Sequence, residues 1–348
     1  VSTFDYYIYG IKYTKNAQED IVIASTSGLH VVYYDGSTLS QIANPSESQF
    51  DSIIIDNVLV ATLYWNETNT TLYLVADERH GAVMSGETHH WLHDNIGANW
   101  KSGLTASGYT LSTKSDAALQ FDVSDGKFYD EDLEIDIADA VDATGQYEQV
   151  LQSPAEIPVL FRAGDPGHWR EQAASTLPYI NGGDNTNLQY NSVAGSTWGQ
   201  TAVANTKFVT YTLISTNDWM YPIKMVQGNT QYESKAAALE NAEDEMIAWG
   251  TLPSAEFDIL FRFILQTGVY AGVKNAQIIE VTDFRMAHVS GVSAAAQDHG
   301  TLAGLNDDDH AQYVLADGTR ALSGAWDMGS QLITNLKLGG TMDANSQP

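Results

Sequence analysis

The chain has 348 residues, with 44 acidic side chains against 16 basic ones, a formal net charge of −28 and no cysteine. This length can bury more than one core, and an apolar fraction of 43% excludes wholesale disorder. So few Lys and Arg residues argue against binding to nucleic acid or to an anionic membrane, and the lack of Cys excludes disulfide and thiolate chemistry.

A membrane-spanning helix is not expected, because it needs about 18 uninterrupted apolar residues. The two closest segments, residues 52–65 and 259–273, are interrupted by Asp56 and Arg262. The first residues show no basic stretch before an apolar run, so we expect no signal peptide. We interpret the sequence as the ordered part of a longer polypeptide.

The first module, residues 1–103, is predicted to be a small antiparallel sheet or sandwich. Residues typical of strands are concentrated in five segments separated by turn signals: 4–12, 20–24, 29–34, 53–65 and 71–76. A short helix is predicted for residues 89–95, with Thr88 at its N-cap and Gly97 at its end.

The second module, residues 104–285, is also predicted to be rich in strands. Residues 133–137 alternate strictly between apolar and acidic side chains, as expected for a half-buried strand. Further strands are predicted for residues 157–161, 207–215, 223–226, 259–266 and 277–282. One helix is predicted for residues 234–249, which are rich in Ala and are followed by Gly250 and Pro253.

The C-terminal residues differ in composition and contain a short repeat. Residues 286–298 are small and polar, which is typical of a linker or neck. Residues 322–332 realign with residues 338–348 at a period of 16. Repeats this short cannot bury an apolar face alone, so we expect sister chains to supply the burial. Residues 299–348 are therefore predicted to begin a repetitive, homotrimeric fibre shaft resembling a β-prism.

Two segments of this region carry a resemblance to a known class of protein. Residues 298–313 resemble the HGxLxGLxDDDHxQY segment of bacteriophage tail-fibre and other virion fibre proteins. In those proteins a repeat of the type LxGxxDMGxxxITNL follows, and residues 322–336 resemble it closely. Ala311 stands where such segments often have Pro, and Val314 stands where Leu is usual.

The earlier part of the chain is similar to uncharacterised phage virion proteins. The residues that carry this similarity are Asp77–Gly81, Met84, His89–His93, Pro158–Arg162 and Trp169–Arg170. Together, the two resemblances imply a structural protein of the virion with no enzymatic activity and no cofactor. They imply a trimeric fibre, a tail fibre rather than a head fibre, that contributes to host attachment or displays a receptor-binding tip.

The implied partners are two further copies of the chain, other virion proteins and a host-surface glycan or receptor. The first module would anchor the fibre to the particle. One alternative is a fibre-borne glycan depolymerase, which needs facing carboxylates and aromatic side chains along a groove of the second module. Another is a Ca²⁺-dependent secreted adhesin, whose melting temperature a chelator would lower.

Histidines are the principal candidate metal ligands. His89 and His93 are four residues apart on the predicted helix, so they share a face, and His80 could complete a zinc site. Position 90 is His, so the glutamate of an HExxH motif is missing. We expect packing or capping roles for these imidazoles, with a metal site as the alternative.

Two acidic runs are weaker candidates for cation binding. Residues 307–309 precede His310 and suit Ca²⁺, and on a trimer axis His299 or His310 could hold an ion. The run lacks the Gly and the distal Glu of an EF-hand, so a turn that sets chain register is the expectation. Asp122, Asp125 and residues 130–132 are predicted to form a solvated acidic loop.

Aromatic side chains near polar, Gly-rich and Asn-rich segments are the candidate contacts to a glycan or receptor. They are Trp169, Trp198, Trp219 and Tyr221. Flat rings with polar tips occur at sugar-binding surfaces and at protein interfaces, so exposure decides between this role and core packing.

Overall fold

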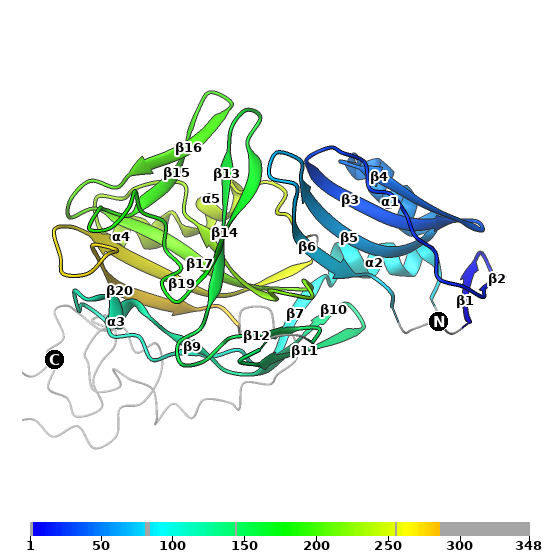
Figure 1. Ribbon diagram of the computed structural model, residues 1–348, viewed down its shortest axis with the longest axis horizontal. Helices are drawn as coiled ribbons and strands as arrows, with labels where there is room; N and C mark the ends of the chain where they lie inside the picture. Colours follow the sequence, from blue (N-terminus) through cyan, green and yellow to red (C-terminus); the bar gives the residue numbers. More distant parts are fainter. Residues whose placement is uncertain (1–2, 81–83, 143–144, 255, 286–348) are drawn as a thin grey trace, which may run out of the picture. The chain divides into compact units, whose positions relative to one another are not determined.

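Strands dominate the described part of the chain, which comprises residues 3–80, 84–142, 145–254 and 256–285 of a computed structural model (Figure 1). Twenty strands and five helices lie in these ranges, so the predicted mainly β character is confirmed. The described residues all belong to one compact unit. None of their helices is both long enough and apolar enough to cross a bilayer.

The first sheet is antiparallel, with strand order β4-β3-β5-β6, and follows a hairpin of two short strands. The hairpin strands and the sheet strands are β1 (Phe4–Ile8), β2 (Ile11–Lys15), β3 (Gly28–Asp35), β4 (Thr38–Ala43), β5 (Val58–Asn66) and β6 (Thr71–Asp77). Helix α1 (Glu47–Asp56) connects β4 to β5, and its Ile53 and Ile54 pack against Val31 and Leu59 of the sheet.

Two strand predictions in this region are wrong. Residues 53–56 belong to α1, because Ser46 and Gln49 form a capping box that starts the helix and overrides the strand propensity of the Ile residues. Residues 20–24 form no strand.

The second sheet has four strands in the order β12-β11-β10-β7. Its strands are β7 (Ala98–Gly103), β10 (Gly126–Asp130), β11 (Leu133–Asp139) and β12 (Glu148–Gln149). The alternation predicted for residues 133–137 is confirmed, because Ile135 and Ile137 are buried while Glu134 and Asp136 are exposed. The boundary that we expected after residue 103 follows β7, which pairs with β10, so the two predicted modules share this sheet.

The third sheet has six strands in the order β14-β13-β18-β17-β19-β20. These strands are β13 (Ile157–Ala163), β14 (His168–Ser175), β17 (Phe208–Thr216), β18 (Ile223–Gln227), β19 (Phe257–Thr267) and β20 (Ala276–Asp283). The β13–β18 pair is parallel and the others are antiparallel. All five strands predicted between residues 157 and 282 are present, with ends shifted by one or two residues.

The six-stranded sheet is buried on both faces, because alternate side chains enter two different cores. Met225 and Leu213 belong to the core shared with Ile135 and Ile137 of the second sheet. Their neighbours in sequence, Val226 and Ile214, belong to the core shared with Tyr64 and Leu74 of the first sheet. The third sheet therefore holds the other two in place.

A buried ionic group lies at the boundary between the first and third sheets. The Nζ of Lys224 is 2.8 Å from Oε2 of Glu171 and 2.8 Å from Oδ2 of Asp218, and it donates to the carbonyl oxygen of Tyr73 at 3.3 Å. The Lys224 side chain is only 1% exposed. This contact joins β18 to β14 and to β6.

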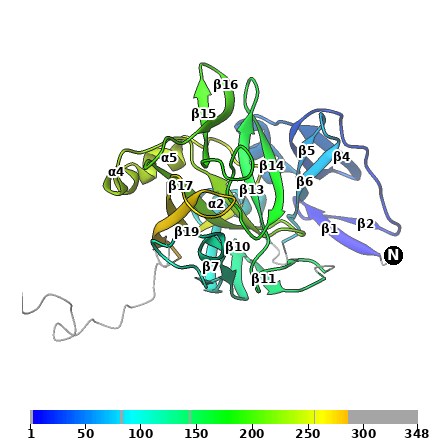
Figure 2. The same ribbon diagram turned by 60° about the vertical axis from the view of Figure 1, so that its left-hand side comes forward.

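The remaining elements lie outside the three sheets. They are α2 (Gly86–Asn95), β8 (Ala106–Ser107), α3 (Asp116–Leu119), β9 (Asp122–Val123), β15 (Gln189–Ala194), β16 (Thr197–Ala202), α4 (Lys235–Glu240) and α5 (Ala242–Ile247). The helix predicted for residues 234–249 is thus two short helices that meet at Asn241. The β15–β16 hairpin extends beyond the third sheet (Figure 2).

Candidate metal centre

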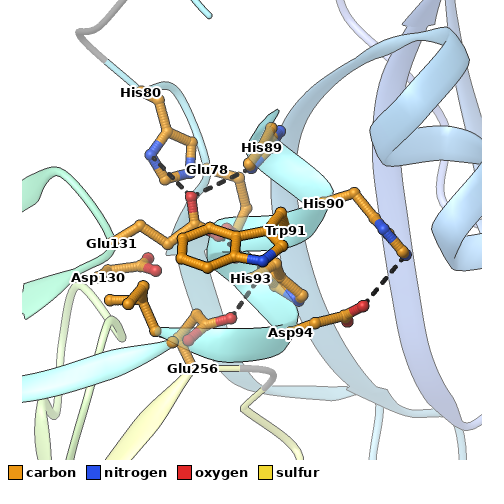
Figure 3. A network of polar contacts seen from close by, with 12 residues as sticks. Glu78, His80, His89, His90, Trp91, His93, Asp94, Asp130, Glu131 and Glu256 are labelled. Carbon is orange, nitrogen blue, oxygen red and sulfur yellow. Dashed lines mark hydrogen bonds and ion pairs between the residues drawn. The ribbon is translucent and has the colours of Figure 1, made fainter. Parts of the chain in front are cut away.

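Seven titratable side chains from four segments meet between the first sheet, α2 and the second sheet (Figure 3). We call them the His–acid cluster, and they are Glu78, His80, His89, His93, Asp130, Glu131 and Glu256. Glu78 and His80 follow β6, His89 and His93 lie on α2, Asp130 ends β10, and Glu256 directly precedes β19.

Helix α2 presents two of the histidines on one face. Ser85 is the N-cap, and its hydroxyl accepts a hydrogen bond from the Thr88 amide, so the predicted cap at Thr88 is three residues too late. The His89 ring centroid lies 4.6 Å from that of His80 and 6.3 Å from that of His93. His90 lies on the other side of α2, where its Nε2 is 3.4 Å from Oδ2 of Asp94 (Figure 3).

The turn between β10 and β11 brings a carboxylate to the centre of the cluster. Asp130 pairs with Leu133, which leaves Glu131 and Asp132 as a two-residue turn. Glu131 has a φ of +51°, in the left-handed region that Gly and Asn usually occupy in such turns. Its backbone is therefore held in an unfavourable conformation, and its carboxylate lies among the histidines.

Two carboxylates are each fixed through one oxygen only. The Asn217 amide donates to Oε1 of Glu78 at 3.2 Å and to Oδ2 of Asp130 at 2.8 Å. The Thr62 hydroxyl also donates to Oε1 of Glu78, at 2.9 Å. The second oxygens, Oε2 of Glu78 and Oδ1 of Asp130, are buried without a hydrogen-bond partner in the described structure.

The imidazoles are oriented by carboxylates. His80 donates through Nδ1 to Asp132 at 2.6 Å, since an ionised carboxylate can only accept, and its buried Nε2 has no hydrogen-bond partner among the described residues. Nε2 of His89 lies 3.7 Å from Oε2 of Glu131 and is otherwise unpartnered in the described structure. Nδ1 of His93 lies 2.8 Å from Oε1 of Glu256 and 3.2 Å from Oε1 of Glu131.

Burial and neighbouring charge shift the protonation of the cluster. Burial and the charge of Glu256 raise the pKa of Glu78, while burial with the charges of Glu78 and Glu256 raises that of Asp130. Burial and the nearby His80 lower the pKa of His89 to about 4, which keeps its ring neutral. Burial also lowers the pKa of His93, but hydrogen bonds to Glu131 and Glu256 outweigh it and raise this pKa to about 11.

Imidazole nitrogens and carboxylate oxygens of this kind are the ligands of divalent transition metals. Three groups of residues could each hold an ion, and they overlap in His80 and Glu131. In each group the ligand atoms lie within 4.8 Å of one another. The groups are His80, His89 and Glu131; Glu78, His80 and Asp130; and His93, Glu131 and Glu256. A pocket of about 450 Å³ lies on one flank, lined by His93, Glu256, Gly97 and Phe257 among others. The pocket gives this end of the cluster a route to solvent.

The structure brings some of the residues predicted from the sequence together and separates others from the cluster. It brings His80, His89 and His93 together, as the metal alternative required, although we expected packing or capping roles for them. The predicted solvated loop is wrong for two of its residues, because Asp130 is 0% and Glu131 is 9% exposed. His299 and His310 lie outside the described residues. Sequence reasoning missed Glu78 and Glu256 as members of a site.

The four aromatic candidates are not grouped on one exposed surface. Trp169 is 5% exposed, and its indole N–H donates to the carbonyl oxygen of Thr251, so its ring is part of a core. Trp198 is half-buried, with its ring centroid 4.3 Å from the Arg162 guanidinium carbon. Trp219 and Tyr221 are half-buried, and the Nζ of Lys224 lies 5.7 Å from the centroid of the Tyr221 ring. A glycan contact by any of them stays a prediction.

Compared with models of protein families, with curated proteins and with solved structures, the chain gives no match. The site is therefore interpreted from its own geometry.

Proposed function

We propose that this protein is a structural component of a virus particle, a trimeric bacteriophage fibre, and a tail fibre rather than a head fibre. The observation that carries the proposal is the sequence of residues 298–336, with its HGxLxGLxDDDHxQY segment followed by an LxGxxDMGxxxITNL-type repeat. These residues come after a mainly β unit, whose last strand is β20. The described unit would lie at the particle-proximal end, and the repeats would lead towards a distal tip that contacts the host surface.

The acidity of the chain suits such an assembly. A net charge of −28 keeps a protein with many strands soluble and discourages pairing between exposed sheet edges. Three copies on one fibre would multiply weak contacts with a host glycan or receptor into firm attachment. The partners in this proposal are two further copies of the chain and other virion proteins.

The native mass of the full chain tests the proposal. Sedimentation equilibrium of the purified full chain is expected to give the mass of a trimer. The variant Trp326→Ser, in the repeat, is expected to weaken the trimer at least tenfold, because the repeat needs the burial that sister chains supply. Trp91→Ser is the matched control, since Trp91 is 55% exposed on α2.

A folded monomer of the full chain would overturn the fibre proposal. So would a trimer that Trp326→Ser and Trp91→Ser weaken equally, because the repeat would then not hold the chains together. Release of reducing sugar from host capsule or lipopolysaccharide would instead favour the depolymerase alternative.

A further inference from the structure

The first observation is a charge imbalance in a buried place. Glu78, Asp130, Glu131 and Glu256 are 0 to 9% exposed. Within the described residues, the ion pairs of these carboxylates are made with histidines and with no Lys or Arg. Burying several carboxylates together is costly unless cations offset their charge, and among the described residues only imidazoles form ion pairs with them.

The second observation is the direction of the unpartnered atoms. Oε2 of Glu131 lies 3.7 Å from Nε2 of His89, and Nε2 of His80 is likewise buried without a hydrogen-bond partner in the described structure (Figure 3). Ligands of a tetrahedral zinc ion are about 3.4 Å apart, given bonds of about 2.1 Å. The other oxygen of Glu131 faces His93. One carboxylate thus lies between two groups of imidazole ligands.

The third observation is the set of groups behind the ligands. Histidines that bind metals usually donate their second ring N–H to a carboxylate or carbonyl. His80 donates to Asp132, while Asn217 and Thr62 hold the far oxygens of Asp130 and Glu78. These contacts hold the three side chains in place and leave Nε2 of His80, Oε2 of Glu78 and Oδ1 of Asp130 buried without a hydrogen-bond partner in the described structure. In the described structure, five buried nitrogen and oxygen atoms of the cluster have no hydrogen-bond partner. Buried polar atoms in proteins usually have one, so packing alone does not explain this arrangement.

We propose that the His–acid cluster binds a divalent transition-metal ion of the Zn²⁺ class, with Glu131 as a ligand shared between two adjacent positions. One position is formed by His80, His89 and Glu131, and the other by His93, Glu131 and Glu256. Ca²⁺ and Mg²⁺ take oxygen ligands almost exclusively, so three imidazoles favour the softer ion.

The role of the ion is structural. The ligands of the two positions together come from the residues after β6, from α2, from the β10–β11 turn and from the residue before β19, so ions at both positions would tie all three sheets and α2 together. Each position offers three largely buried protein ligands, so a water molecule would complete a tetrahedral site there. This inference does not depend on the fibre proposal, because it concerns residues 78–256 only.

Metal binding to the full chain, with any affinity tag removed, tests the proposal directly. The protein is stripped with a chelator, dialysed and titrated with Zn²⁺ by calorimetry, and the bound metal is counted by elemental analysis. One or two equivalents are expected, with micromolar or tighter affinity. Co²⁺ is expected to give the visible absorption bands of a low-coordinate site with nitrogen and oxygen ligands.

Three variants locate the site. His89→Ala and Glu131→Gln are each expected to weaken Zn²⁺ binding at least tenfold, and Asp132→Asn, which alters the partner of His80, by about tenfold. His90→Ala is the matched control on the same helix, outside the cluster, and is expected to bind as the wild type does.

No binding of Zn²⁺ or Co²⁺ to the folded, stripped wild type would overturn the proposal. Equal loss of affinity in His89→Ala and His90→Ala would also overturn it. Circular dichroism identifies any variant that fails to fold, and the wild-type titration decides the question without the variants. Binding of Ca²⁺ but not of Zn²⁺ would count against the proposed ligand class.

Discussion

Lys224→Met is the substitution whose cost the structure defines most closely. It removes the only cation seen in contact with two buried carboxylates, since the Asp218 side chain is 2% and that of Glu171 is 12% exposed in the described structure. Removing one partner of a buried ion pair costs about 3–5 kcal/mol, because the remaining charge stays desolvated. For a chain of this size the melting temperature is expected to fall by on the order of 10 °C.

The pH dependence separates this electrostatic cost from a loss of packing. Burial raises the pKa of Glu171 even beside Lys224, so folding favours its protonated form. A carboxyl with a raised pKa contributes stability that is present below the unfolded pKa of about 4.3 and is lost as pH rises through the folded pKa. Without Lys224, Glu171 can avoid a buried unpaired charge by taking up a proton, which is easier at low pH. The difference in free energy of unfolding between the wild type and Lys224→Met is therefore expected to be smaller at pH 5 than at pH 8.

Urea unfolding at pH 5 and at pH 8, followed by circular dichroism and by tryptophan fluorescence, measures the loss of stability and its dependence on pH. Lys127→Met is the matched control, because its ion pairs on β10 and β11 are exposed and its loss is expected to cost far less than the loss of Lys224. Adding Asp218→Asn to Lys224→Met is expected to recover part of the loss. A cost below about 1 kcal/mol for Lys224→Met, or the same cost at both pH values, would refute the reasoning.

Two further predictions concern α2 and its metal ligands. Zn²⁺ at 100 times its dissociation constant is expected to stabilise the stripped protein by about 2.7 kcal/mol and to raise its melting temperature by about 5 °C in differential scanning calorimetry. His90→Ala should show the same rise, and a rise with Ca²⁺ alone would instead support the adhesin alternative. Gly86→Ala is expected to cost on the order of 2 kcal/mol in urea unfolding, because its Cβ would lie 2.1 Å from the carbonyl oxygen of Ile55 in α1. Gly199→Ala, where a Cβ meets nothing within 4 Å, serves as its control, and equal costs would contradict the steric argument.

The strands were predictable where local pattern and burial agree. Residues 133–137 alternate because one face of β11 packs in a core and the other meets solvent. The prediction failed at residues 53–56, where Ile residues favour a strand but the cap at Ser46 and Gln49 starts a helix. That capping pattern is visible in the sequence and is the signal that would have corrected the prediction.

The His–acid cluster was predictable only in part. His89 and His93 lie one helical turn apart, so their shared face follows from the spacing alone. Glu256 reaches the cluster only because β19 pairs with β17 in the third sheet, and no local pattern marks that pairing. The burial of Asp130 and Glu131 was missed because a run of acidic residues in a short turn is usually solvated, whereas here the turn packs against α2 and against His80, which follows β6.

The strand order of the six-stranded sheet has a consequence for biosynthesis. Strand β13 pairs in parallel with β18, and β17 is flanked by β18 and β19. A nascent chain on the ribosome can thus pair β13 with β14 at once, but it lacks the second neighbour of β13 until β18 has emerged and one partner of β17 until β19 follows. Contacts between distant parts of a chain form slowly, so one edge of β13 stays unpaired while the residues between β14 and β18 are synthesised.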